Sequence, residues 1–333
     1  MKVLVTGGAG FIGSNLVRFL LNEHPDYRVI NADKLGVGSN VQSLDDLKSD
    51  KKYKFIKSDT SDPKFAGRVI KDVEAVFNLA AESHVDRSIA NPFLFLQSNT
   101  IGTFNLLEAM RKSNEDAKFV QVSTDEVYGE IDAGSFDENV LLKPSSAYAA
   151  SKAAADLFCL AHFKTYGLKI VITRCTNNFG PYQFPEKLVP KTVARASMNL
   201  QVPIYGSGKN VRDWIYVLDH CKALDIVLQK GKVGEIYNIS SGNELENIEI
   251  VKKILRIMNK PEKLITFVED RPGHDIRYSL DSSKVRGELG WKPKYRFDEA
   301  LRSTVEWYLE NKWWWESLAT DEVIHPTPWN LKW

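Results

Sequence analysis

The sequence lacks the cysteine and histidine patterns that mark disulfide-rich or metal-binding proteins. Its 333 residues include only three cysteines, with no CxxC spacing. This odd number argues against structural disulfides and favours reduced thiols in a cytosol. We expect Cys159, Cys175 and Cys221 to be core or near-core residues. The six histidines form no HExxH or comparable pair, so we predict no bound metal.

Long apolar runs and an excess of one charge are also missing. No run approaches the roughly 18 apolar residues that a membrane span needs. The segment that follows Met1 does not read as a secretory signal. The 44 basic residues nearly balance the 43 acidic ones, which gives no overall field for nucleic acid or a membrane surface. We therefore expect a cytoplasmic protein that holds any anionic ligand through a few placed residues.

The first half of the chain alternates short apolar runs with stretches of helical spacing. The runs predict buried strands at Lys2–Thr6, Arg28–Ala32, Lys54–Lys57, Ala75–Leu79, Phe119–Ser123 and Ile170–Arg174. The stretches between them predict helices at Phe11–Glu23, Pro92–Lys112 and Ala147–Tyr166. This alternation predicts an α/β fold with a doubly wound parallel sheet and helices on both faces.

The pattern becomes irregular past about Asn177, where prolines and glycines mark loops. We predict a strand at Glu235–Ile239 and a long helix at Asp298–Leu318. The expected division is a Rossmann domain of residues 1–177, to which 211–243 return, and a smaller mixed α/β lobe of 178–210 and 244–333. The Trp313–Trp315 run is expected to pack on this lobe or at an oligomer surface.

A glycine loop joins the first predicted strand to the first predicted helix. Gly7, Gly10 and Gly13 form GxxGxxG, in which small residues let the backbone approach a pyrophosphate at the positive helix N-terminus. Asp33 ends the second strand, where a carboxylate can accept hydrogen bonds from ribose hydroxyls and repel a 2′-phosphate. The pattern favours NAD over NADP. The alternative for Asp33 is a solvated loop aspartate.

Two further segments lie at carboxyl ends of predicted strands, where open α/β sheets bind ligands. Asp59 follows the third strand and can reach the adenine edge. Leu79, Ala80 and Ala81 follow the fourth strand and can floor a cofactor cleft. Loop chemistry or simple packing remains the alternative for each.

Tyr148 and Lys152 stand four residues apart, so on a helix they share one face. An ammonium beside a phenol is expected to lower the pKa of the tyrosine and make it a base. A surface tyrosine beside a salt-bridging lysine is the alternative.

Ser123-Thr124-Asp125-Glu126 ends the fifth strand. Thr124 can hydrogen-bond a sugar hydroxyl, and the two carboxyl groups offer a general acid and a general base. A simple dehydrogenase needs neither group, whereas elimination of water needs both. The alternative is a solvated acidic turn.

With these motifs in view, the chain resembles the dTDP-glucose 4,6-dehydratase family of the extended short-chain dehydrogenase/reductase superfamily. The resemblance covers nearly the whole length. Related epimerases usually keep the tyrosine and lysine but lack the aspartate–glutamate pair. One stretch departs from the family pattern, because Gly36–Ser39 replaces a tyrosine-containing segment. The motifs are the glycine loop, Ala80–Ser88, Ser123–Gly129, the Tyr148/Lys152 pair, Asn177–Tyr182, Phe184–Lys187, Arg212–Trp214 and Arg271–Asp275.

The resemblance implies a lyase that converts dTDP-glucose into the 4-keto-6-deoxy sugar with a bound NAD, in deoxysugar biosynthesis of the rhamnose type. Tyr148 takes the C4 hydroxyl proton, Lys152 holds the ribose, and Thr124 polarises the C4 oxygen. Glu126 removes the C5 proton and Asp125 protonates the leaving C6 hydroxyl. The resemblance also implies a homodimer that uses helices near 92–112 and 147–166. Thymidine is favoured over uridine and cytidine by this likeness alone.

The same likeness assigns the binding residues. Guanidinium groups suit a diphosphate because they offer paired donors. A structural loop histidine is the alternative for His84. Cofactor contacts are expected from Gly7, Gly10, Phe11, Ile12, Gly13, Asp33, Lys34, Leu35, Asp59, Thr60, Leu79, Ala80, Ala81, Ser83, Asn99, Ser123, Tyr148, Lys152 and Asn178. Substrate contacts are expected from Ser83, His84, Thr124, Asp125, Glu126, Tyr148, Asn177, Lys187, Leu188, Pro203, Ile204, Tyr205, Arg212, Asn247, Arg271 and His274.

Two other functions are compatible with these sequence motifs. A UDP-sugar 4-epimerase or decarboxylase on the same fold shares the glycine loop and the YxxxK pair but does not require Asp125 with Glu126. A non-catalytic regulator that senses NAD or a sugar nucleotide requires none of the reacting groups.

Overall fold

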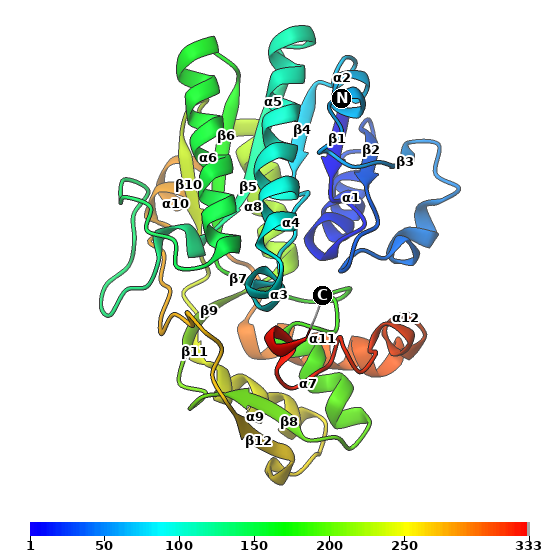
Figure 1. The fold of residues 1–333 in the computed structure, drawn as a ribbon. Helices are drawn as coiled ribbons and strands as arrows, with labels where there is room; N and C mark the ends of the chain where they lie inside the picture. The colour runs from blue at the N-terminus through cyan, green and yellow to red at the C-terminus, as the bar shows by residue number, and fades with distance from the viewer. Residues whose placement is uncertain (332–333) are drawn as a thin grey trace.

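The computed structural model describes residues 1–331 and centres on a seven-stranded parallel sheet (Figure 1). The strand order is β10-β6-β5-β4-β1-β2-β3, so the order reverses between β1 and β4. This confirms the predicted doubly wound sheet, and each predicted strand begins and ends within one residue of the observed one. The strands are β1 (Lys2–Thr6), β2 (Arg28–Asp33), β3 (Tyr53–Lys57), β4 (Ala75–Asn78), β5 (Lys118–Thr124), β6 (Ile170–Cys175) and β10 (Ile236–Ile239).

Helices cover both faces of this sheet because successive strand residues are apolar on both sides. In β1, Val3 and Val5 pack into one core cluster and Leu4 packs into the other. The first face carries α1 (Phe11–Glu23), α8 (Val217–Lys230) and α10 (Ser283–Leu289). The opposite face carries α2 (Pro63–Val69), α5 (Gly102–Ser113) and α6 (Ala147–Tyr166).

Helix α6 has the predicted bounds because both ends are capped. The Ser146 hydroxyl accepts a hydrogen bond from the Ala149 N–H at 3.1 Å, and Gly167 ends the helix at φ 70°. The single helix predicted over 92–112 is wrong in detail. It is α4 (Pro92–Phe95), a π-helical segment η2 (Leu96–Ile101) and α5, preceded by the short α3 (Val85–Ala90). Inserted π turns of this kind leave no trace in apolar spacing.

A second group of elements lies below the carboxyl edge of the large sheet in Figure 1. One sheet has the order β11-β9-β7, and β12 pairs with β8. Their core includes Trp214, Ile250 and Leu301. The elements are β7 (Asn177–Phe179), α7 (Leu188–Ser197), β8 (Val202–Tyr205), β9 (Val211–Tyr216), β11 (Glu244–Glu246), α9 (Asn247–Ile257), β12 (Ile265–Val268), α11 (Phe297–Glu310) and α12 (Lys312–Trp315).

The helix predicted over 298–318 is interrupted, which corrects the prediction. Helix α11 ends before Asn311, and α12 and the 3-10 turn Glu316–Leu318 follow. The Asn311 side chain donates to the Trp307 carbonyl at 2.9 Å at the break. The break allows Trp314 and Trp315 to be buried in the lobe, while Trp313 remains 58% exposed.

The structure tests several other sequence-based predictions within residues 1–331. The three cysteines are free and buried, as expected. No helix in this range is long and apolar enough to cross a membrane. Strand β10 joins the large sheet, and Val285, Leu289 and Trp291 also pack against it. The division into two domains stays a prediction.

Candidate active site

Two adjoining cavities open at the carboxyl edge of the large sheet. The first has a volume of about 270 Å³ and runs from the glycine loop past the ends of β4 and β5 to β7. The second, of about 160 Å³, lies against α7, β8 and β9. The cavities share a wall of five residues, which are Ser83, Glu126, Asn177, Glu186 and Lys187.

The glycine loop forms the floor of the first cavity and leaves a helix end open. A Cβ at Gly13 would lie 2.2 Å from the Gly7 oxygen, and Gly7 itself has φ 69°, so packing excludes side chains there. At Gly10 an added Cβ meets only the Gly7 oxygen, at 3.2 Å. Gly10 is the N-cap of α1, and no side chain caps that terminus. These features fit a dinucleotide whose pyrophosphate lies on the N–H groups of α1.

Asp33 is a buried carboxylate, which excludes the alternative of a solvated loop residue. It is 4% exposed and lines the first cavity. Its oxygens accept hydrogen bonds from Ala9 N at 3.0 Å, Leu35 N at 2.7 Å and Ser39 Oγ at 2.9 Å. A carboxylate accepts about four hydrogen bonds, so one position remains for a ribose hydroxyl. The atypical Gly36–Ser39 stretch lines the same cavity.

Most residues predicted for the cofactor line the first cavity, and two do not. Leu35 does not line the cavity, and its backbone N–H donates a hydrogen bond to Asp33 Oδ1. The Asn99 side chain accepts from the Glu82 N–H at 2.8 Å and donates to Ser151 Oγ at 2.9 Å. Asn99 lies in the π-helical segment and thus stabilises the loop that follows β4. The predicted cofactor residues that line the cavity are Gly7, Gly10, Phe11, Ile12, Gly13, Asp33, Lys34, Asp59, Thr60, Leu79, Ala80, Ala81, Ser83, Ser123, Tyr148, Lys152 and Asn178.

The predicted reacting groups meet in the first cavity. Thr124 ends β5, and Asp125 and Glu126 open the 3-10 turn η3 (Asp125–Tyr128). Thr124, Asp125, Glu126, Tyr148 and Lys152 all line this cavity. The Thr124 hydroxyl donates to Asp125 Oδ1 at 3.1 Å and accepts from Glu126 N at 3.3 Å. The alternative of a solvated acidic turn is therefore wrong for Asp125, which is 3% exposed.

The two carboxyl groups differ in their surroundings. Burial and the neighbouring Glu126 raise the pKa of Asp125 to about 8. Its Oδ2 is buried without a hydrogen-bond partner among residues 1–331. Burial also raises the pKa of Glu126, while Arg271 and Arg212 act in the opposite direction. A protonated acid beside a partly exposed carboxyl group suits combined acid and base catalysis.

The expected effect of Lys152 on Tyr148 is wrong for the protein alone. Burial and the Glu126 charge raise the pKa of Tyr148 well above its usual value. The Lys152 ammonium instead donates to the Val122 carbonyl at 2.6 Å, and burial lowers its own pKa. Helical spacing placed both side chains in one cavity, but it could not show that the lysine has a backbone partner there.

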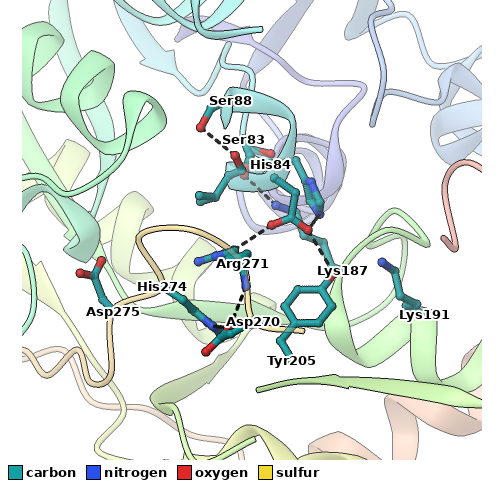
Figure 2. Close-up of polar contacts among 12 residues, drawn as sticks. Ser83, His84, Ser88, Lys187, Lys191, Tyr205, Asp270, Arg271, His274 and Asp275 are labelled. Atoms are coloured by element: carbon teal, nitrogen blue, oxygen red, sulfur yellow. Dashed lines mark hydrogen bonds and ion pairs between the residues drawn. The ribbon is translucent and has the colours of Figure 1, made fainter. Parts of the chain in front are cut away.

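The second cavity collects the residues predicted for a nucleotide diphosphate. Arg212 donates to the carbonyls of Val211 and Asp275, at 2.7 and 2.9 Å. Lys187 donates to the Ser83 carbonyl at 2.7 Å, as Figure 2 shows. The predicted residues that line this cavity are Ser83, His84, Glu126, Asn177, Lys187, Leu188, Pro203, Ile204, Tyr205, Arg212, Asn247, Arg271 and His274.

Sequence reasoning missed Asp86, Glu186 and Lys191, which also line the second cavity. Lys191 lies on α7 four residues after Lys187, the N-cap of that helix, and this helical spacing could have found it. Its Nζ donates to the His325 carbonyl at 3.2 Å, and burial lowers its pKa to about 8. Asp86 and Glu186 stand inside the motifs Ala80–Ser88 and Phe184–Lys187. The sequence assigned them no role, because their partners are distant along the chain.

Comparison with known proteins supports one family. The profile described as GDP-mannose 4,6 dehydratase matches residues 4–304. A probable dTDP-glucose 4,6-dehydratase of Sinorhizobium fredii is 46% identical over 96% of this chain and 95% of its own length.

Solved structures agree with these relatives. The dTDP-glucose 4,6-dehydratase of Streptomyces venezuelae, solved with NAD bound, is 45% identical with a TM-score of 0.93 and covers 96% of this chain and 100% of its own. A UDP-glucose 4-epimerase of Thermotoga maritima is 31% identical with a TM-score of 0.86, covering 93% and 99%.

Proposed function

Because the chain belongs to the family of dTDP-glucose 4,6-dehydratases, we propose that it removes water from dTDP-glucose to give dTDP-4-dehydro-6-deoxyglucose. NAD is the cofactor, as in the family structures. The observation that carries the proposal is that Asp125 and Glu126 line the same cavity as Tyr148 and the glycine loop. An epimerase needs no such pair.

In the proposed reaction, Tyr148 accepts the proton of the C4 hydroxyl and Thr124 donates a hydrogen bond to the C4 oxygen. When bound, NAD supplies the acceptor for the C4 hydride, a positive charge that favours the Tyr148 phenolate, and the hydride that later returns to C6. The 4-ketone acidifies the C5 proton, which Glu126 removes. Asp125 gives its proton to the C6 hydroxyl, so water leaves and a C5–C6 double bond forms. A proton then returns to C5.

The second cavity suits the diphosphate of the substrate. Lys187 and Lys191 donate to backbone carbonyls and form no ion pair with a carboxylate in the part of the chain that the structure describes. Arg212 likewise donates to backbone carbonyls. Cations without a carboxylate at ion-pair distance favour an anionic ligand at this place.

Product analysis with dTDP-, UDP- and CDP-glucose side by side tests the proposal. A 4-keto-6-deoxy product absorbs near-ultraviolet light in alkali, whereas an epimer does not. Formation of this product fastest from the thymidine nucleotide is expected. An epimer as the product would support the rival enzyme, and no turnover with any nucleotide would support the sensor.

Activity should depend on pH through Asp125. Its pKa, about 8, lies far above the ordinary value for an aspartate, so the acid is protonated at neutral pH and loses its proton as the pH rises through 8. We expect kcat/KM to fall about tenfold per pH unit above that point. A pH–rate profile of dehydration checks this, and a flat profile up to pH 10 would contradict the acid role.

We also propose a homodimer formed through an exposed apolar surface on α3, α4, η2 and α6, called here the helical face. Figure 1 shows α4, α5 and α6 side by side on one side of the sheet. A second copy can bury this face by two-fold symmetry. The residues of the helical face are Ile89, Phe93, Leu94, Leu96, Ile101, Leu157 and Phe158.

Leu157→Glu should convert the dimer into a monomer, because two-fold symmetry places the buried charge in the interface twice. Light scattering after gel filtration measures this. Leu141→Glu is the matched control, since Leu141 is 87% exposed and lies outside the helical face. A parent that is already monomeric would overturn the proposal.

A reducing compartment such as the cytoplasm is proposed from the three free, buried cysteines. We also propose that the large sheet with its helices holds the cofactor, while the elements around α7, β8 and β9 hold the nucleotide sugar.

A further inference from the structure

Asp86 is a buried carboxylate at the junction between the large sheet and the smaller lobe. It lies in the first turn of α3 and is 1% exposed. Its oxygens accept hydrogen bonds from Arg271 Nη1 at 3.0 Å and from the Tyr205 hydroxyl at 3.1 Å. His84 Nε2 lies 3.9 Å away. The side chains of Arg271, Tyr205 and His84 point toward one another in Figure 2.

The carboxylate remains charged in this place. Burial favours the protonated form, but His84, Arg271 and Lys191 outweigh burial and lower the pKa of Asp86 to about 2. His84 contributes little positive charge at neutral pH, because burial lowers its pKa to about 4. An ionised Asp86 can therefore hold the Arg271 guanidinium at any working pH.

The contact leaves donors of Arg271 available to a ligand. Only Nη1 donates to Asp86, so the guanidinium keeps further N–H donors. Both Arg271 and Tyr205 line the second cavity. A free arginine side chain loses considerable rotamer entropy when a ligand fixes it. A guanidinium that is fixed beforehand avoids that loss.

We propose that Asp86 is a positioning residue, whose shared carboxylate fixes Arg271 and Tyr205 so that the unused donors of Arg271 meet the diphosphate. The inference rests on the proposed function, since it takes a nucleoside diphosphate as the occupant of the second cavity. Asp86 reaches across from α3 to two segments of the smaller lobe, so it also fixes how the two parts of the site meet.

The test is Asp86→Asn, measured by calorimetric binding of dTDP and by steady-state kinetics on the holoenzyme. We expect dTDP affinity to fall and KM to rise about 10- to 100-fold, with kcat changed less than threefold. Arg271→Gln should weaken binding similarly. Both substitutions disrupt the same contact between Asp86 and Arg271. The double variant should therefore bind dTDP little worse than Arg271→Gln alone.

Asp225→Asn is the matched control. Asp225 is equally buried at 1%, accepts from His24 at 2.8 Å and Gln229 at 2.7 Å, and lines neither cavity. It should affect thermal stability without changing dTDP affinity. If Asp86→Asn does not fold, Asp86→Glu carries the test, because it keeps the charge and displaces the carboxylate by one methylene.

Unchanged dTDP affinity in the Asp86 variant that folds would overturn the inference. So would a double variant whose loss of dTDP affinity equals the product of the two single-variant losses. Failure of the proposed function gives a different result from failure of this inference. In that case the parent binds dTDP but yields no dehydrated product, or it does not bind dTDP at all.

Discussion

Glu126→Gln should stop dehydration and leave oxidation at C4 intact. Glutamine has nearly the same shape but cannot accept the C5 proton, so the rate of product formation should fall roughly 10²- to 10⁴-fold. Tyr148 and Thr124 are unchanged in this variant, so the first step still proceeds. A single-turnover experiment with dTDP-glucose should therefore show reduced nicotinamide accumulating on the protein while the alkaline absorbance of the product stays absent.

Glu130→Gln provides the matched control for this experiment. Glu130 lies four residues further along, is exposed, and lines neither cavity. Its variant should keep the parental rate. Dehydration by Glu126→Gln at the parental rate would refute the assignment of the base.

Tyr148→Phe should block the reaction one step earlier. The variant loses the acceptor of the C4 hydroxyl proton but keeps the ring that packs edge-to-face against Phe95, with centroids 6.3 Å apart. We expect a rate loss of roughly 10²- to 10⁴-fold, and no reduced nicotinamide in the single-turnover experiment. The two variants thus differ in the spectrum of the bound cofactor as well as in rate.

Tyr128→Phe is the comparison for a buried tyrosine outside the cavities. The Tyr128 hydroxyl donates to Asn238 Oδ1 at 2.9 Å, so its loss should cost about 1 kcal/mol of unfolding free energy and leave turnover unchanged. Reduced nicotinamide in Tyr148→Phe at the level of Glu126→Gln would show that another group takes the C4 proton.

The sequence was sufficient for features that depend on local patterns. Strands buried on both faces appear as continuous apolar runs, and α6 carries its own capping signals at Ser146 and Gly167. The carboxyl ends of parallel strands share one edge, which is why the glycine loop and Thr124–Glu126 could be expected in one cavity. The position of Asp125 in that cavity could be expected for the same reason.

Features that depend on tertiary contacts could not be predicted from local sequence patterns. The partners of Asp86 lie 119 and 185 residues away, so no spacing pattern relates them. Asn99 in the π-helical segment contacts Glu82 and Ser151, which lie 17 and 52 residues away. Likewise, the raised pKa of Tyr148 reflects burial and the Glu126 carboxylate, which the YxxxK motif does not encode.

The wall common to both cavities has a consequence for the timing of catalysis. Glu126 stands in that wall and is partly exposed while the second cavity is open to water. In the proposed complex a sugar nucleotide lies across this wall and displaces the water, and the loss of hydration should strengthen the carboxylate as a base. On the proposed mechanism, this base reaches its full strength only when its own substrate is seated, so removal of the C5 proton is tied to occupation of the second cavity.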